Sequence, residues 1–211
     1  MMSSAKYIMI FCGVCIVPLL ITGCTASSSV VSEQNHYVLD VQRPEGIKST
    51  GGKGVLKIKR LSISSRFESY QFVYRITDLK YESNFYNKFF ASPASLITEE
   101  TRQWLGQSGI FSSVVNMLSA ADYDYILEGH IEALYGDYRK KDERQAVLEI
   151  RYAIIDASLS REKIAFEKTY AAVAPLPVDT PSGLAEAMNV CLAQILTSLE
   201  ADLKVLFSST P

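Results

Sequence analysis

Apolar residues recur at helical spacing near the C-terminal end of the chain, over residues 182–207. Their spacing forms one continuous stripe, which predicts a long amphipathic helix packed on a sheet or on another helix. The stripe consists of Leu184, Met188, Cys191, Leu192, Ile195, Leu199, Leu203 and Leu206. Because the thiol of Cys191 falls inside this stripe, we predict that it is buried and inert rather than catalytic.

A second, shorter helix is predicted to begin at Pro93. Ser92 is a residue type that caps helix N-termini, and proline is favoured at the first helical position. Gly106 or Gly109 is expected to end this helix. Its interior face would carry Ile97, Thr101, Trp104 and Leu105. The residues predicted to face water are Glu99, Glu100, Arg102 and Gln103.

Alternating apolar and polar residues predict strands over much of the remaining chain. Short loops join the segments 123–138, 145–156 and 163–173, so we expect them to form an antiparallel meander. Further strands are predicted at 37–41, 55–63, 70–76 and 113–117, with a bend near Arg60. Along 123–138, one face would carry Tyr125, Leu127, Gly129, Ile131, Ala133 and Tyr135. The pattern predicts an α+β fold: a mainly antiparallel or mixed sheet with two helices packed on one face.

Residues 66–90 hold nine of the 22 aromatic residues of the chain. Tyr70, Phe72 and Tyr74 alternate as a strand requires, but the aromatic residues that follow have no clean period. Most of them are expected to pack in the core. The alternative is a partly exposed surface that binds a partner, since aromatic rings supply much of the binding energy at interfaces. The residues predicted for that surface are Tyr81, Tyr86 and Phe89.

The first 23 residues have the composition of a secretion signal. Lys6 is their only charge, and residues 7–21 form an apolar segment shorter than the ~20 residues needed to span a bilayer. The segment ends at Leu20-Ile21-Thr22-Gly23-Cys24, which resembles the lipobox of bacterial lipoproteins. That resemblance implies cleavage between Gly23 and Cys24 and lipidation of Cys24. The alternatives are an ordinary cleaved signal, with Cys24 incidental, or an uncleaved transmembrane anchor.

Without the signal, 188 residues remain, which fits one domain of ordinary size. Residues 24–36 would form a Ser-rich lipidated tether, and 37–211 a single periplasmic domain. Loss of Lys6 leaves 20 basic against 23 acidic residues, and neither a basic stripe nor a nucleic-acid-binding motif is present, so no nucleic acid partner is expected. Cys191 is then the one unmodified cysteine, so the domain must be held by its core rather than by a disulfide.

Residues with catalytic or metal-binding chemistry are sparse in this chain. His36 and His130 are the only histidines, and Glu128, His130 and Glu132 would share one strand face. A solvated strand face explains that set better than a metal site, because no further ligand is evident. The glycines at 51–54 lack the spacing of a phosphate-binding loop. We therefore predict no catalytic residues, no enzyme activity, no metal and no cofactor.

Several short motifs, in order, resemble the ABC-type transport auxiliary lipoprotein family, which includes proteins like paraquat-inducible protein C. The resemblance covers nearly all of the chain after Cys24. Its motifs are Tyr37-Val38-Leu39, Val73-Tyr74-Arg75, Tyr86-Asn87-Lys88-Phe89-Phe90-Ala91-Ser92-Pro93, Gly109-Ile110-Phe111, Asp124-Tyr125-Ile126-Leu127-Glu128-Gly129 and the terminal amphipathic helix. The family usually has tryptophan where Phe89 or Phe90 stands here, which is a minor departure.

This resemblance implies a non-catalytic envelope protein that works beside an ABC transporter and MCE-domain proteins, moving lipids or other hydrophobic cargo between membranes. It also implies homo-oligomeric rings as one form of assembly. Thr25 after the cysteine, in place of aspartate, is similar to lipoproteins of the outer membrane, so we expect that membrane rather than the inner one. The alternative function is an outer-membrane lipoprotein that regulates peptidoglycan synthesis or forms a secretion or assembly ring.

Overall fold

Strand β7 (Tyr125–Asp137) is the central strand of the sheet, because it pairs with four other strands. On one side it pairs antiparallel with β8 (Gln145–Asp156), which in turn pairs antiparallel with β9 (Lys163–Pro175). This is the predicted meander.

The computed structural model describes residues 33–44, 52–158 and 162–208, and Glu33–Pro211 forms one compact unit. The predicted signal peptide, most of the tether, and Gly23 and Cys24 lie outside the described residues.

The other side of β7 is shared by three short strands that follow one another along its length. These are β2 (Val55–Ile58), β3 (Ser62–Ile63) and β4 (Gln71–Arg75), all parallel to β7. Ile58 pairs with Leu127 and Ser62 with His130, so one extra residue lies between β2 and β3, which confirms the irregularity predicted near Arg60. Because one long strand is paired parallel on one side and antiparallel on the other, the sheet is mixed.

Three further strands extend the sheet beyond these short ones. They are β5 (Tyr81–Phe89), antiparallel to β4; β1 (Asn35–Tyr37), parallel to β5; and β6 (Ser113–Asn116), parallel to β2. The first strand ends four residues earlier than predicted. The reason is tertiary: residues 38–44 leave the sheet and lie against the helices, where Leu39 is buried.

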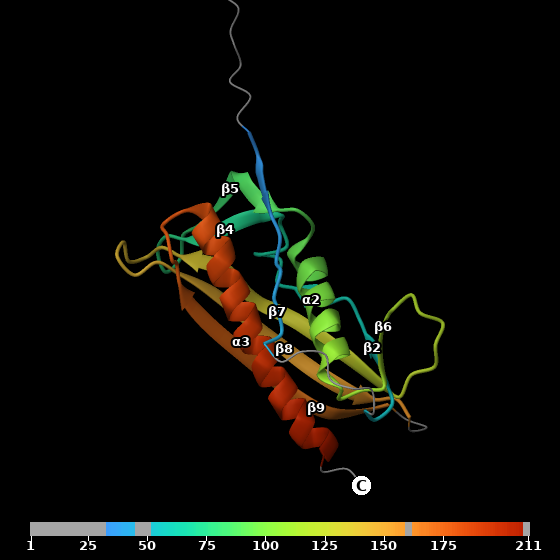
Figure 1. The fold of residues 1–211 in the computed structure, drawn as a ribbon. Coiled ribbons are helices and arrows are strands. Elements are labelled where there is room, and N and C mark those ends of the chain that lie inside the picture. The colour runs from blue at the N-terminus through green and yellow to red at the C-terminus, as the bar shows by residue number, and fades with distance from the viewer. Residues whose placement is uncertain (1–32, 45–51, 159–161, 209–211) are drawn as a thin grey trace, which may run out of the picture. The chain divides into compact units, whose positions relative to one another are not determined.

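Helices α2 (Pro93–Ser108) and α3 (Pro181–Ser208) cover one face of the sheet, which confirms the predicted α+β fold (Figure 1). The side chain of Ser92 accepts a hydrogen bond from the backbone N–H of Ser95, as a helix cap does, and Gly109 ends α2 in the left-handed conformation at φ 73°. Within the described ranges, every helix lacks the length or the apolarity that a membrane span requires.

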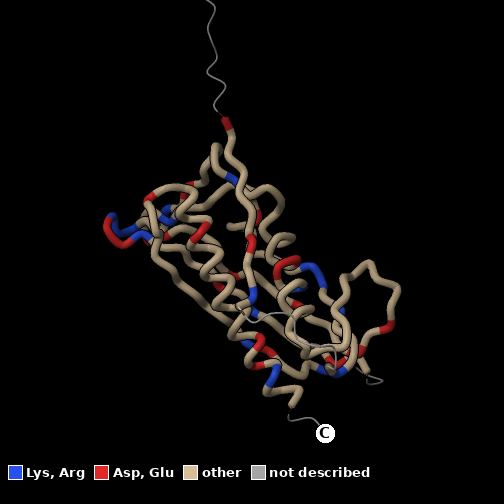
Figure 2. Tube along the Cα trace, in the orientation of Figure 1, with Lys and Arg blue, Asp and Glu red and all other residues tan. Residues whose placement is uncertain are grey.

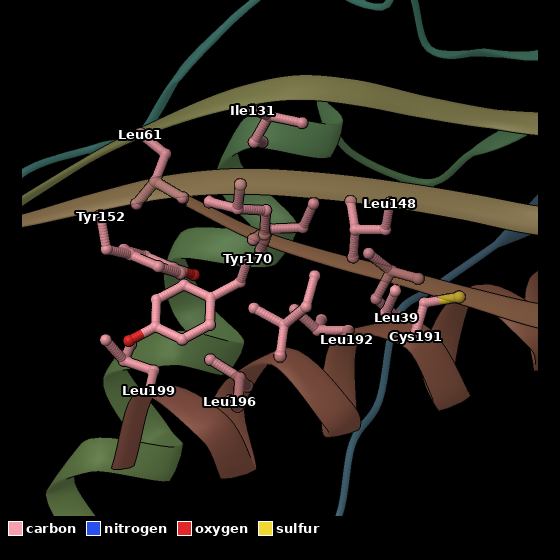
Figure 3. Close-up of a cluster of buried hydrophobic side chains, with 14 of the residues drawn as sticks. Leu39, Leu61, Ile131, Leu148, Tyr152, Tyr170, Cys191, Leu192, Leu196 and Leu199 are labelled. Atoms are coloured by element: carbon pink, nitrogen blue, oxygen red, sulfur yellow. The ribbon is translucent and has the colours of Figure 1, made fainter. Parts of the chain in front are cut away.

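The main core lies between α3 and strands β8 and β9. Leu192, Leu196 and Leu199 of α3 point toward the side chains of Leu148 and Tyr152 (Figure 3). The hydroxyl of Tyr152 lies 2.9 Å from the Oγ1 of Thr101, so a fully buried polar group is satisfied across the core by α2. Cys191 is fully buried here, as predicted, and burial raises the pKa of its thiol to about 11.

Two predictions about which side chains face the core and which face water are wrong. Glu100 of α2 is buried rather than facing water, because its carboxylate accepts a hydrogen bond from the backbone N–H of Val41 at 3.0 Å. In β7, the register shifts between Ile131 and Ala133, so Leu134 replaces Ala133 on the buried face. One inserted residue reverses which side chains face the core, and period-two reasoning carried past that point fails.

Two helical glycines provide a test of local packing. An ideal Cβ at Gly183 would lie 2.0 Å from the carbonyl oxygen of Val178, whereas one at Gly106 meets no atom within 4 Å. Gly183→Ala is therefore expected to destabilise the domain by about 1–3 kcal/mol, because backbone has to move. Gly106→Ala, at an exposed helical position, is expected to stabilise it by about 0.5–1 kcal/mol. Urea unfolding of both variants measures this, and shifts of the same sign would contradict it.

Candidate interaction surface

An irregularity in strand β5 turns aromatic rings outward. Gln71 of β4 pairs with Lys88, but the next residue, Phe72, pairs with Asn84. Residues 85–87 are thus extra on the β5 side of this ladder, and they form a three-residue bulge. Bulges bend the strand and re-aim side chains, and they are common at sheet edges and near functional sites.

The bulge is closed by its own polar groups. The Oδ1 of Asn84 accepts hydrogen bonds from the backbone N–H of Tyr86 at 2.9 Å and of Asn87 at 3.2 Å. These are donors that the interrupted ladder with β4 leaves without a partner on that strand. Asn87 then returns to the sheet beside β1, where its Oδ1 accepts from the side chain of Asn35. The bulge is therefore a defined conformation and not a frayed strand.

Two rings of β5 are exposed, those of Phe85 and Tyr86, and so is that of Phe90, which directly follows the strand. We refer to these three residues as the aromatic edge. Their exposed fractions are 60%, 48% and 71%. Phe85 and Tyr86 contact each other edge to face at 5.4 Å between centroids, and Phe90 contacts His36 of β1 at 6.1 Å. Every other phenylalanine in the described residues is buried or half-buried. Burying one such ring contributes about 1.5–3 kcal/mol, so a partner that covers these rings would be bound favourably.

The predicted partner surface of Tyr81, Tyr86 and Phe89 is only partly consistent with this arrangement. Phe89 is 2% exposed and packs edge-on against Phe72, so it belongs to the core, and the prediction that it lies on the partner surface is wrong. Tyr81 is half-buried, with its ring against Phe67 and Tyr135. Tyr86 is exposed, and its role in binding stays a prediction. The three extra residues at 85–87 explain the difference, because they interrupt the alternation of side chains along β5 and leave the aromatic residues without a regular period.

The segment between β1 and the end of the first described range, residues 38–44, is here called the strap. It runs between α2 and α3 (Figure 1). The backbone N–H of Asp40 donates to Asn189 Oδ1 of α3 at 3.0 Å, and Leu39 is 3% exposed. Together with the bond from Val41 to Glu100, these contacts fasten the start of the domain to both helices.

Arg43 completes the attachment of the strap through a buried ion pair with Glu200 of α3. Its Nε and Nη2 donate to the two carboxylate oxygens at 2.9 and 2.7 Å. The indole N–H of Trp104 on α2 donates to the same carboxylate at 2.7 Å, and the ammonium of Lys204 lies 2.6 Å away. The side chains of Arg43 and Glu200 are 2% and 7% exposed. Strap, α2 and α3 therefore meet at one carboxylate.

The charge state of this carboxylate follows from its partners. Burial alone would raise the pKa of Glu200, but the hydrogen bonds and positive charges of Arg43 and Lys204 outweigh it and bring the pKa to about 2. Glu100 has no cationic partner of this kind, and burial raises its pKa despite the bond from Val41. Glu200 is thus ionised at neutral pH, as the bidentate contact with a guanidinium requires.

A second polar cluster lies on the open face of the sheet, away from the helices. Ser62 Oγ is 2.8 Å from His130 Nδ1, and Glu132 lies 3.7 Å from His130 Nε2. The latter distance exceeds a hydrogen bond, and Arg151 contacts the same Glu132 carboxylate at 3.3 Å. Ser62, His130 and Arg151 line a hollow of about 280 Å³. As expected from the sequence, Glu128, His130 and Glu132 share this face. Glu128 forms an ion pair with Lys59, and Glu132 forms one with Arg151 of β8.

This arrangement does not have the geometry of a nucleophilic triad, in which an acid orients the histidine through a direct hydrogen bond. Among the described residues, no group of three or more histidine, cysteine, aspartate or glutamate side chains is placed to hold a metal ion. Charged residues instead gather at the tip of the β7–β8 hairpin, where Arg139 bridges Asp137 and Asp78 (Figure 2). Of these features, the aromatic edge and the strap are the ones that suggest a role for the domain.

Comparisons with known proteins place the fold. No protein-family model matches the chain, and no curated protein does. A solved structure of a Xanthomonas campestris protein of the DUF330 family matches with a TM-score of 0.70 at 15% identity, over 82% of this chain and 95% of that one. An uncharacterised protein matches with a TM-score of 0.64 at 11% identity, over 81% of this chain and 99% of that one. At these identities the likeness shows a shared fold.

A looser match is the PelC protein from Paraburkholderia phytofirmans, which was crystallised as a dodecamer. The TM-score is 0.45 at 15% identity, over 74% of this chain and 94% of that one. A likeness of this degree says nothing about how the present chain assembles.

Proposed function

We propose that this chain is a lipid-anchored periplasmic protein that acts by binding, as a non-catalytic auxiliary component of an ABC/MCE-type transport system. Two features of the sequence support this: the lipobox-like segment that ends at Cys24, and the ordered motifs that resemble the auxiliary lipoprotein family. The cargo class is lipid or another hydrophobic compound. The outer membrane is the proposed site of the anchor, and the partners are an MCE-domain protein and ABC transporter components.

The observation that carries the proposal is how the start of the domain is built into the fold. From Asn35 to Arg43 the chain is bound in turn to β5, to α3, to α2 and again to α3, where the last contact is the buried Arg43–Glu200 pair. A domain held at a membrane through its N-terminal end needs this end to be firmly attached to the core. Otherwise the first residues would peel away and the tether would lengthen.

Replacement of the anchoring cysteine tests the proposal. Cys24→Ser is expected to abolish palmitate labelling and to release the protein into the soluble periplasmic fraction, because the lipid anchor on Cys24 is lost. Cys191→Ala is the matched control, since it removes the other cysteine of the chain after residue 23 and is expected to leave labelling and fractionation unchanged. Membrane fractionation of Cys24→Ser at the wild-type level would contradict the proposal.

The transport role has its own readout. In vivo crosslinking of the acylated protein, followed by affinity purification, is expected to recover an MCE-domain protein and an ABC transporter component. Recovery of a penicillin-binding protein in their place would replace the transport role with regulation of peptidoglycan synthesis. The Cys24→Ser variant serves as the control, because a protein released from the membrane is expected to lose these crosslinks.

A further inference from the structure

We propose that the aromatic edge, Phe85, Tyr86 and Phe90, contacts the surface of the bilayer in which the protein is anchored. It would act as a second, non-covalent membrane contact that sets the orientation of the domain. The inference rests on the lipid anchor of the proposed function. The ligand is the boundary between headgroups and acyl chains, where amphipathic rings such as tyrosine are enriched in membrane proteins.

The length of chain between the anchor and the fold carries the first part of the argument. Glu33, the first described residue, follows Cys24 by nine residues. Nine residues span at most ~32 Å when fully extended. Whichever surface of the domain lies beside Glu33 is therefore held within a short distance of the bilayer.

The pairing of β1 with β5 shows which surface that is. Asn35 pairs with Asn87 and Tyr37 with Phe89, and the backbone N–H of Phe90 donates to the carbonyl oxygen of Tyr37 at 2.8 Å. The chain thus enters the fold directly beside the exposed rings, and β1 and β5 lie at the same end of the domain (Figure 1). The three rings fall within six consecutive residues.

The two lysines near the aromatic edge are both paired with other side chains. This edge is therefore better suited to the boundary between headgroups and acyl chains than to a strongly charged partner. Lys80 is paired with Glu82 at 2.6 Å, and the ammonium of Lys88 donates to the side-chain oxygen of Gln34 at 2.6 Å. No basic cluster is present in β5, so the contact would depend on the rings and not on headgroup charge. Three rings bind a membrane weakly by themselves, but a short tether makes their contact intramolecular and so raises its occupancy.

Lipid quenching of an introduced tryptophan tests this placement. The experiment uses the full acylated protein, reconstituted in phosphatidylethanolamine–phosphatidylglycerol vesicles with or without lipids brominated near the headgroup. Trp104, the single native tryptophan, is 3% exposed and bonded to Glu200, so wild-type emission provides the unquenched reference. The test variant is Phe90→Trp. The control is Leu118→Trp, at a 94% exposed position after β6, on the opposite edge of the sheet.

The emission added by Phe90→Trp is expected to shift to shorter wavelength and to fall at least about twofold with brominated lipid. The emission added by Leu118→Trp is expected to change little. Equal quenching of both variants, or of neither, would overturn the inference. So would crosslinking of the Phe90 position to a protein partner while its tryptophan stays unquenched. Palmitate labelling of the same samples separates the two proposals: labelled but unquenched protein rejects only the membrane contact, and unlabelled protein rejects the anchor.

Discussion

Glu200→Leu is expected to destabilise the domain by about 3–5 kcal/mol, the usual cost of removing one partner of a buried ion pair. The substitution takes the shared acceptor away from Arg43, Trp104 and Lys204 while leaving the Arg43 guanidinium 2% exposed in the native arrangement. For a domain of this size the melting temperature should fall by roughly 10 °C. Differential scanning calorimetry or urea unfolding at pH 7 measures the change.

Two further variants show whether the effect belongs to the pair. Glu186→Leu replaces an exposed glutamate of the same helix and is expected to change stability by less than about 0.5 kcal/mol. The double variant Arg43→Met with Glu200→Leu removes both charges, so it should recover part of the loss. If the double variant is no more stable than Glu200→Leu, the cost lies in α3 packing and not in the ion pair.

The same pair predicts a pH dependence with a definite sign. Because the folded pKa of Glu200 is lowered to about 2 from 4.5, its contribution is present above pH 4.5 and is lost as pH falls toward 2. The stability difference between the wild type and the double variant should therefore shrink over that interval. A difference that stays constant from pH 7 to pH 2.5 would show that Glu200 does not titrate as its surroundings require.

Phe89→Ala is expected to cost about 3–5 kcal/mol, because it removes a ring that is 2% exposed and leaves a cavity beside Phe72. Tyr86→Ala, three residues earlier, is the matched control. Its ring is 48% exposed, so we expect a loss below about 1 kcal/mol. Thermal unfolding of the two variants compares these values directly. Similar losses for both would mean that the bulge is not formed and that the two rings share one environment.

This pair also separates the structural from the functional rings. If Tyr86→Ala keeps the wild-type melting temperature but weakens a contact of the anchored protein, that residue acts in binding. Phe89→Ala cannot give such a result, because any loss of binding would be accompanied by a loss of stability. The distinction was not accessible from residue type, since two aromatic residues of one segment look equivalent in a sequence.

Much of the architecture follows from local patterns. The stripe of α3, the Ser92 cap of α2 and the alternation in β8 each involve neighbours within a few residues, so the sequence contains the information that places them. The meander of β7, β8 and β9 follows as well, because its loops are short. The parallel pairing of β2, β3 and β4 with β7 does not, since those partners lie far apart in the chain.

The candidate surface was harder to predict for the same reason. Of Tyr81, Tyr86 and Phe89, the sequence could indicate that rings were concentrated, but exposure depends on a bulge that resets the side-chain alternation. Phe85 and Phe90 were missed as surface residues. Asn84, whose side-chain oxygen accepts hydrogen bonds from the backbone N–H groups of Tyr86 and Asn87, was the one local signal of that bulge. The helical pattern likewise gives no sign that Glu100 and Glu200 are buried, because the strap that covers them comes from a distant part of the chain.

The sequence by itself determined the fold class, the two helices, the meander and the expectation of a lipid anchor at Cys24, because periodicity, caps and signal motifs act over short stretches of chain. Tertiary structure alone decided which rings are exposed and that the strap is locked to α3 through Arg43 and Glu200, 157 residues apart. Contacts at such separation depend on the assembled sheet and helices. No local pattern records which distant residues that assembly brings together.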